Sequence, residues 1–381
     1  MRNLGKYIFW LLVAGYCYAI TMNTARNGPD FSVYWRTAHF FLEGDPVYSA
    51  TRDGIMTFKY PPWIFPLFLP FGLFSLTVAK LIWGEIEALA LLYIIFWLQK
   101  RAKLSVIAVC LLCFSGIWTV HAFDGQVSLP LTACALALFS VFRDNTRNSK
   151  SFLLAYLLST KIFTMFPFLG FKWRNSDFFR IGALVALLAI CSLPVIIAHN
   201  WNLSDLVTQY KIATGPGVGA SGNPQITVKG DQAQEFVSMI FRVANLDYRN
   251  QTLIFFYCGL LSLFFGIFWR IRASKLPADV QWAGWLALTA TLQPLAWFHT
   301  FVLAFPAAVL SLDDSIKMKS ISRSLMSLLG ILMIAGVTRK TLGEFGELLQ
   351  VISVKSWGIL LCCILLTVRP SLPSNNTRKL S

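Results

Sequence analysis

The stretch Gly28–Pro62, GPDFSVYWRTAHFFLEGDPVYSATRDGIMTFKYPP, separates the first apolar segment of the chain from a short apolar run broken by prolines. It contains an aspartate, Asp30, only a few residues after the first apolar segment, followed by Phe31, Tyr34 and Trp35. If the first segment crosses a membrane, Asp30 lies at the membrane surface among aromatic side chains. A carboxylate in such a partly dehydrated place can act as a base.

The composition of the 381-residue chain is that of a membrane protein. Hydrophobic residues make up 56% of the sequence and charged residues 13%, which is more apolar than a soluble core requires. The 33 Lys+Arg against 18 Asp+Glu give a net charge of +15. The basic residues concentrate in short clusters between apolar runs, as expected where positive charge fixes the orientation of loops. This pattern favours a role in topology over nucleic-acid binding.

Segment lengths and basic clusters together predict an all-α polytopic membrane protein with about ten transmembrane helices and both termini in the cytoplasm. The predicted spans are residues 7–22, 77–98, 104–120, 127–142, 181–197, 252–269, 280–292, 301–312, 324–337 and 351–368.

Two further apolar segments are predicted not to cross the membrane. Residues 63–74 are short and broken by prolines, so they are expected along the outer surface. Residues 151–171 have basic residues at both ends and are expected to enter and leave from the cytoplasmic side. The chain, 1–381, then forms a single integral membrane domain. It has a first external loop over 23–76, carrying interfacial helices, and a second large external loop over 198–251.

Two glutamates and a lysine fall within the apolar segments. Glu85 and Glu87 lie in the second predicted span, where an ionised carboxylate is costly and usually faces a cavity or a partner, so both a functional role and a structural pairing are open. Lys161, at the break in the re-entrant segment, is either a phosphate contact or a lysine that extends to an interface.

The external turn after the third predicted span contains His121 and Asp124, which either contact a substrate or satisfy the turn. The eight cysteines all lie in apolar stretches, where cysteine behaves as a small hydrophobic residue. Cys110 and Cys113 have no partnering His or Cys nearby in the sequence, so no zinc or redox site is expected. No Asp-x-Asp pair suited to a metal ion occurs either, and no metal or other cofactor is expected.

A series of short motifs runs along the chain. They are Asp30-Phe31-x-x-Tyr34-Trp35, Gly44-Asp45-Pro46-x-Tyr48, Phe58-x-Tyr60-Pro61-Pro62, Gly125-Gln126-Val127-Ser128, Lys161 ahead of Pro167, and Gln293-Pro294-Leu295-Ala296-Trp297-Phe298-His299. In this order they resemble glycosyltransferase family 87, whose members are polytopic GT-C enzymes that take a sugar from a polyprenyl phosphate. The resemblance covers roughly residues 7–312, and its specificity lies in the order of the motifs.

The second external loop departs from the family pattern. Family members tend to carry an Asn-Gln-Ser-like motif there, followed by an arginine several residues on. This chain offers two alternatives ahead of Arg242, which are Asn223-Pro224-Gln225 and Asp231-Gln232-Ala233-Gln234.

The resemblance implies a GT-C-type fold and a glycosyltransferase of the mannosyltransferase type. It implies transfer of a hexose, with mannose the leading candidate, from a polyprenyl-phosphate sugar to a lipid-linked or cell-surface glycan acceptor. The transfer inverts the anomeric carbon, with Asp30 as general base. Candidates for binding the donor phosphate or the substrate, from the resemblance or from their predicted location, are His299, Lys161, Arg242, Tyr34, Lys59, Tyr60 and Gln126.

The expected partners are the lipid-linked donor, the glycan acceptor and membrane lipids, without nucleic acid. The expected location is the bacterial inner (plasma) membrane, with the site facing the periplasm or cell exterior. Two other classes remain open. One is a transporter or flippase for a lipid or glycan, although no internal repeat is evident. The other is a non-catalytic assembly subunit, in which Asp30 caps a loop helix over residues 31–42.

Overall fold

The computed structural model describes residues 2–48, 58–143, 155–161, 164, 166, 175–214, 233–246, 251–293 and 296–368. Within these ranges the chain forms helices and no strand, so the predicted all-α fold is confirmed there. The helices are α1 (Arg2–Arg26), α2 (Pro29–Leu42), η1 (Pro62–Ile64), α4 (Phe65–Phe68), η2 (Leu69–Leu73), α5 (Leu76–Gln99), α6 (Leu104–Cys113), α7 (Ser115–Asp124), α8 (Ser128–Arg143), α10 (Asn175–Ala198), α11 (Leu203–Thr214), α12 (Phe236–Val243), α13 (Gln251–Ala273), α14 (Ala278–Leu292), η5 (Phe298–Ala304), α15 (Phe305–Lys317), α16 (Ile321–Ala335), α17 (Arg339–Val351) and α18 (Val354–Thr367).

Four of the described helices are long and apolar enough to cross a membrane, namely α1, α5, α10 and α13. Two bent pairs raise the number to six if each pair forms one span. They are α6 with α7, bent by 60°, and α17 with α18, bent by 77°. The membrane class is therefore confirmed, whereas the count of about ten spans remains a prediction. Shorter apolar helices in α8 and α16 fall on two of the other predicted spans.

The two segments expected not to cross differ in how much of them is described. Residues 62–73 break into the three short pieces η1, α4 and η2, with Pro66 and Pro70 each near the start of a piece. None of these pieces is long enough to span a bilayer. Of residues 151–171, the structure describes 155–161, 164 and 166. There a helical turn ends at Leu158, three residues before Lys161. The remainder of this expected re-entrant segment lies outside the described residues.

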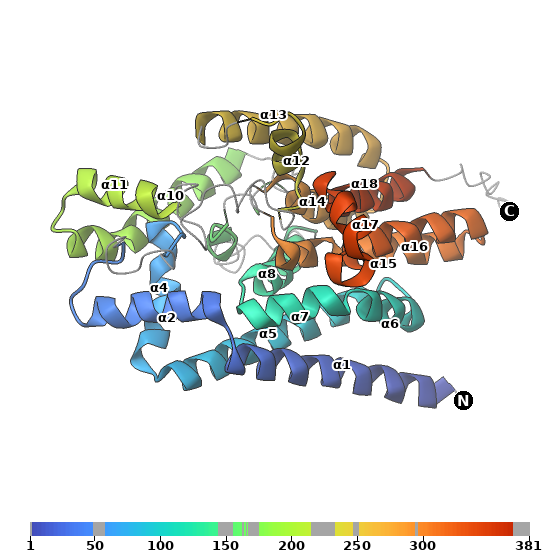
Figure 1. The fold of residues 1–381 in the computed structure, drawn as a ribbon, viewed down its shortest axis with the longest axis horizontal. Coiled ribbons are helices and arrows are strands. Elements are labelled where there is room, and N and C mark those ends of the chain that lie inside the picture. Colours follow the sequence, from blue (N-terminus) through green and yellow to red (C-terminus); the bar gives the residue numbers. More distant parts are fainter. Residues whose placement is uncertain are drawn as a thin grey trace, which may run out of the picture.

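The helices α2, α4 and α11 gather at one end of the molecule, and the N-terminus of α1 lies at the other (Figure 1). Polar contacts join helix ends and loops remote from α2. Arg101 Nε donates to Asp279 Oδ2 over 2.6 Å, Lys317 Nζ donates to the Arg101 carbonyl, and the backbone N–H of Lys103 donates to Asp313 Oδ1. The basic residues after α5 thus lie beside Lys317 at the end of α15, as the charge pattern of the sequence predicts for the cytoplasmic loops.

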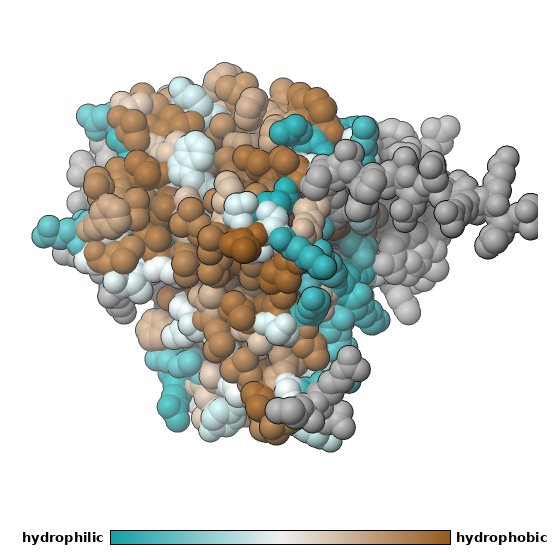
Figure 2. All heavy atoms as spheres, turned by 90° about the vertical axis from the view of Figure 1, so that its right-hand side faces the viewer, coloured by the Kyte–Doolittle hydropathy of each residue, from teal (hydrophilic) through white to brown (hydrophobic). Residues whose placement is uncertain are grey.

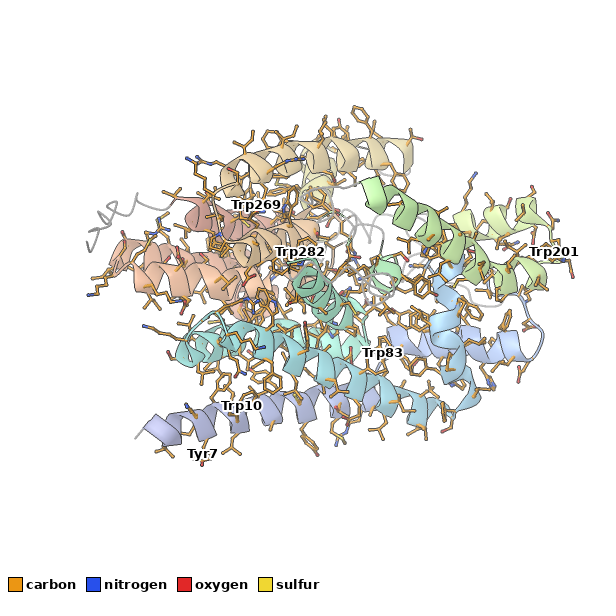
Figure 3. All side chains as sticks on the ribbon, turned by 180° about the vertical axis from the view of Figure 1, so that it is seen from behind. Tyr7, Trp10, Trp83, Trp201, Trp269 and Trp282 are labelled. Carbon is orange, nitrogen blue, oxygen red and sulfur yellow. The ribbon has the colours of Figure 1, made fainter. Side chains whose placement is uncertain are left out.

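Much of the outer surface is apolar. Figure 2 shows apolar side chains over much of one face, with groups of hydrophilic side chains among them. The exposed face of α13 alone carries Phe255, Phe256, Leu260, Leu263, Phe264 and Ile267. Two exposed aromatic residues, Tyr7 and Trp201, lie at opposite ends of the molecule (Figure 3). Trp and Tyr are enriched at both surfaces of a bilayer, so this placement suits a protein that spans one.

The first long helix packs tightly against the next one because of a glycine. A Cβ atom placed on Gly84 of α5 would lie 2.8 Å from Thr21 Cα and 2.9 Å from the Thr21 carbonyl oxygen in α1. One turn further along, Cys17 Sγ lies 3.7 Å from the carbonyl oxygen of Ala88. The backbones of α1 and α5 therefore touch at Gly84, as small residues permit in membrane helices.

We expect Gly84→Ala to lower the free energy of unfolding by about 1–2 kcal/mol, because the added methyl group overlaps backbone atoms that cannot move aside. Gly259→Ala in α13 is the matched control, since nothing lies within 4 Å of a Cβ atom there. That variant should leave stability unchanged or raise it by up to about 1 kcal/mol through helix propensity. Thermal unfolding of both variants in the same detergent compares them. Equal stability of the two would contradict the close packing of α1 on α5.

Candidate active site

Two glycines bring the start of α2 against the turn between α7 and α8. Gly28 has a left-handed backbone, with φ of 51°, which lets the chain leave α1 and begin α2 at Pro29. Its N–H donates to the carbonyl oxygen of Phe123 over 2.9 Å. Gly125, with φ of 67°, ends α7, and a Cβ atom there would lie 3.2 Å from Gly28 Cα and 2.9 Å from Phe31 Cβ. This close approach places Asp30 beside Gln126.

The turn Asp124–Ser128, hereafter the site turn, contacts three residues that come from distant parts of the sequence. Gln126 Nε2 donates a hydrogen bond to Asp30 Oδ2. The hydroxyl oxygen of Ser128 accepts from Lys161 Nζ over 3.1 Å. Asp124 Oδ2 lies 3.4 Å from His299 Nδ1. The structure therefore brings together four residues that the sequence singled out, namely Asp30, Gln126, Lys161 and His299.

The environment of Asp30 makes it a stronger base than an ordinary aspartate. Its side chain is half-buried in the first turn of α2. Burial raises the pKa of its carboxyl group, and the nearby Asp124 adds to that rise, while His299, the hydrogen bond from Gln126 and the charge of Lys161 oppose it. Because a base works best when its pKa approaches the working pH, the net upward shift suits proton abstraction.

Lys161 and His299 lie close enough to Asp30 for electrostatic interaction. Burial lowers the pKa of Lys161 to about 8, against the opposing charge of Asp30, so its amine is still protonated at neutral pH. Burial and the charge of Lys161 lower the pKa of His299 to about 3. His299 is therefore neutral and offers one N–H donor. The site thus combines two carboxylates, Asp30 and Asp124, with a cation and a neutral hydrogen-bonding ring.

The first loop supplies a layer of tyrosines beside Asp30. The hydroxyl groups of Tyr34 and Tyr60 lie 2.9 Å apart, and the Tyr48 hydroxyl donates to the Tyr60 carbonyl oxygen over 2.6 Å. Tyr34, Tyr60 and Lys59 all interact electrostatically with Asp30. Lys59 is exposed to solvent.

The segment around His299 carries several buried polar atoms without a hydrogen-bond partner among the described residues. They are Gln293 Oε1, Trp297 Nε1, His299 Nδ1 and Thr300 Oγ1. A buried polar group left unpaired costs about 1–3 kcal/mol. A cluster of such atoms in one short segment beside Asp124 is therefore suited to bind a polar ligand. Pro294 and Leu295 of the same motif lie outside the described residues.

The structure places Arg242 in a separate network. Its guanidinium donates to the carbonyl oxygen of Ala233 over 2.6 Å, to Ser353 Oγ over 2.7 Å and to the carbonyl oxygen of Val351 over 3.1 Å. Arg242 thereby ties α12 to the bend between α17 and α18. Of the two alternative motifs ahead of it, residues 223–225 lie outside the described chain. Of the other, 231–234, Ala233 and Gln234 are described, and Arg242 donates to the carbonyl oxygen of Ala233.

Sequence reasoning left the partners of the second-span glutamates open, and the structure separates the two residues. Glu85 is exposed, whereas Glu87 is fully buried beside His121, with 3.2 Å between Glu87 Oε1 and His121 Nδ1. His121 is also fully buried, so it satisfies the site turn and does not face a ligand.

Two further buried charged residues were missed. Glu235 Oε2 accepts from the backbone N–H of Ala296, three residues before His299. Lys355 is 1% exposed, donates to the carbonyl oxygen of Ile334, and lies 4.6 Å from the centre of the Phe298 ring. A lysine within the apolar run 351–368 is a visible signal in the sequence. The sequence gives no signal that Lys355 lies near the His299 segment, because the two are far apart along the chain.

Within the described ranges, no group of three or more His, Cys, Asp or Glu residues has a geometry that could hold a metal ion. The model of glycosyltransferase family 87 matches residues 58–306, which is more than half of the chain. The match includes Lys59, Gln126, Lys161 and His299, while Asp30 precedes it. No curated protein and no solved structure matches the chain.

We expect Arg242→Gln to destabilise the protein by about 1–3 kcal/mol, because its loss leaves buried acceptors unpaired. The exposed Arg26 at the end of α1 supplies the control, and Arg26→Gln should change stability by less than about 0.5 kcal/mol. Thermal unfolding in detergent without substrate measures both. An Arg242→Gln protein as stable as the wild type would show that these contacts do not hold the fold together.

Proposed function

Because the chain belongs to glycosyltransferase family 87 and is a membrane glycosyltransferase, we propose that it transfers a hexose from a polyprenyl-phosphate sugar to a lipid-linked or cell-surface glycan acceptor. The observation that carries this proposal is the convergence of one carboxylate, Asp30, with Lys161 and His299 around the site turn. Family membership also favours an enzyme over a transporter, a flippase or a non-catalytic subunit.

Asp30 acts as the general base in this proposal. Gln126 holds Oδ2, so Oδ1 is the oxygen that accepts the proton of the incoming acceptor hydroxyl. As that proton leaves, the acceptor oxygen forms a bond to the anomeric carbon, and the bond from this carbon to the phosphate oxygen breaks on the opposite side. The configuration therefore inverts. A retaining reaction would instead require a carboxylate nucleophile and a covalent glycosyl intermediate.

The leaving group is a polyprenyl phosphate that gains one negative charge as the bond breaks. It requires charge stabilisation and no general acid. Lys161 supplies a positive charge, and neutral His299 supplies an N–H donor. In this proposal the exposed Lys59 also binds the phosphate, and the tyrosine pair Tyr34 and Tyr60 binds the sugar. The contacts of Arg242 give it a structural role, so it is a weaker candidate for the phosphate.

The proposed location is the bacterial inner membrane with the site on the periplasmic or exterior side. Two observations support it. The helices α2 and α11 lie at the end of the molecule opposite the start of α1 (Figure 1). The basic residues Arg101, Lys103 and Lys317 meet one another near Asp279 and Asp313, in a cluster with no contact to the site turn among the described residues. Basic clusters mark the cytoplasmic side of a membrane protein.

The test of this function is a transfer assay with the purified protein in lipid nanodiscs. Labelled polyprenyl-phosphate sugars, with the mannose form first, are incubated with membrane lipid and glycan acceptors, and nucleotide sugars serve as the comparison donors. The proposal requires labelled product from at least one lipid-linked donor. Product from nucleotide sugars alone would overturn it.

We expect Asp30→Asn to lower kcat by about 10²–10⁴-fold, since the amide cannot accept the proton of the acceptor. Glu43→Gln is the matched control, because Glu43 is an exposed carboxylate that follows the same helix and pairs with His39. It should retain wild-type turnover. In the wild type, activity should decline as the pH falls towards the raised pKa of Asp30, at a pH above that of an ordinary aspartate. Turnover by Asp30→Asn at the wild-type rate would remove Asp30 as the base.

Lys161 should set the alkaline limit of the pH profile. Since its pKa is about 8, the positive charge is present below that pH and is lost above it, so kcat/KM should fall as the pH rises through about 8. A phosphodiester donor has no ionisation in this range. Lys161→Arg keeps its charge and should move the decline to higher pH, whereas Lys161→Ala should lower kcat/KM by about 10²-fold or more at all pH values. If kcat/KM of Lys161→Arg fell at the same pH as in the wild type, Lys161 would not be the group that sets the alkaline limit.

A further inference from the structure

A fully buried hydrogen-bond network lies behind the site turn. The backbone N–H of Leu129, in the first turn of α8, donates to His121 Nε2 over 2.9 Å. On the other side of the ring, His121 Nδ1 lies 3.2 Å from Glu87 Oε1. Thr24 Oγ1 lies 2.5 Å from Glu87 Oε2 and 2.9 Å from the carbonyl oxygen of Ala122. The network therefore joins α1, α5, α7 and α8.

The contacts fix where the protons lie. Because Nε2 accepts from Leu129, a neutral ring of His121 carries its proton on Nδ1, which lies beside Glu87 Oε1 although neither atom has a hydrogen-bond partner among the described residues. The Thr24 hydroxyl has one proton and two oxygen neighbours. If Glu87 is protonated, its O–H donates to Thr24 and Thr24 donates to Ala122, so both contacts of Thr24 have a proton. A neutral Glu87 also avoids an uncompensated charge in the apolar interior.

His121 holds the site turn at both of its ends. Its carbonyl oxygen accepts from the N–H groups of Gly125, over 3.0 Å, and Gln126. Its ring accepts from Leu129, the residue after Ser128. Ser128, which contacts Lys161, lies between these anchors, Gln126, which contacts Asp30, belongs to the first anchor, and Asp124, which contacts His299, directly precedes it.

We propose that Glu87 and His121 form a positioning pair, which holds the His121 ring in place and thereby sets the geometry of the site turn against Asp30. The inference rests on the proposed function, because its effect is read from sugar transfer. Neither residue touches the substrate. A misplacement of reacting groups by about 1 Å can cost 10²-fold in rate, so a loosened turn should lower kcat with little effect on KM.

A double-mutant cycle in the purified protein tests this pair. We expect His121→Ala to lower kcat by about 10–100-fold. In the double variant with Gln126→Ala, the fold decrease in kcat should be smaller than the product of the two single decreases by about 3-fold or more. Both changes remove the same support from Asp30. If His121→Ala does not fold, His121→Asn replaces it, since the shorter side chain cannot reach Leu129.

Conservative variants separate positioning from bulk packing. His121→Gln places an acceptor oxygen where Nε2 lies and should keep turnover within about 5-fold of the wild type. Glu87→Gln retains an acceptor for the His121 Nδ1–H and a donor for Thr24, and it should be similarly active. Glu87→Leu fills the same space without polar atoms and should lose activity as His121→Ala does.

His199 supplies the matched control for the cycle. It is also a buried histidine beside a carboxylate, with 3.1 Å between its Nδ1 and Asp205 Oδ2, but it lies after α10. His199→Ala and Gln126→Ala should act independently, so that their losses multiply.

Three results would overturn the inference. They are independent losses for His121→Ala and Gln126→Ala, a change confined to KM, or His121→Gln as impaired as His121→Ala. The proposed function fails separately, if Asp30→Asn and Gln126→Ala both leave transfer unchanged.

Discussion

The candidate site depends on one close approach of two backbones. The N–H of Gly28 donates to the carbonyl oxygen of Phe123, and Gly125 packs directly on Gly28. A side chain on either glycine would meet backbone or Cβ atoms at about 3 Å, and both have the left-handed conformation that only glycine adopts readily. Without this approach, Asp30 would begin a surface helix with no contact to the rest of the site.

Burial creates both the opportunity and the cost in this site. Removing Asp30 from water raises its pKa and makes it a better base, but the same removal is unfavourable for Lys161. The opposite charges of Asp30 and Lys161 stabilise each other. Gln126 donates a hydrogen bond to Asp30, and Ser128 accepts one from Lys161. A neutral His299 adds a donor without another buried charge. The unpaired polar atoms around it leave capacity for hydrogen bonds to a ligand.

The sequence predicted the residues of the site better than their arrangement. Composition and segment length predicted a helical membrane protein, because apolar runs of sufficient length have few other folds. The ordered motifs included Gln126 and His299, which the structure brings to Asp30. Contacts between side chains of helices distant in the sequence could not be predicted, because they depend on how the helices pack. Glu87 and Glu85 look equivalent in the sequence, yet one pairs with His121 and the other is exposed. Arg242 was a sequence candidate for binding the donor phosphate or the substrate, and in the structure its guanidinium donates to protein carbonyl groups.

A neutral network behind a charged site has a physical advantage. If the pair behind the site turn were ionised, its field would act on Asp30 through a medium of low dielectric, where interactions between charges are strong. A negative Glu87 would raise the pKa of Asp30 further, and a positive His121 would lower it and weaken the base. With His121 accepting from Leu129, the ring cannot take a second proton without breaking that hydrogen bond. The network can therefore hold the turn in place while the charged groups of the site itself, Asp30, Asp124 and Lys161, set the field that a substrate meets.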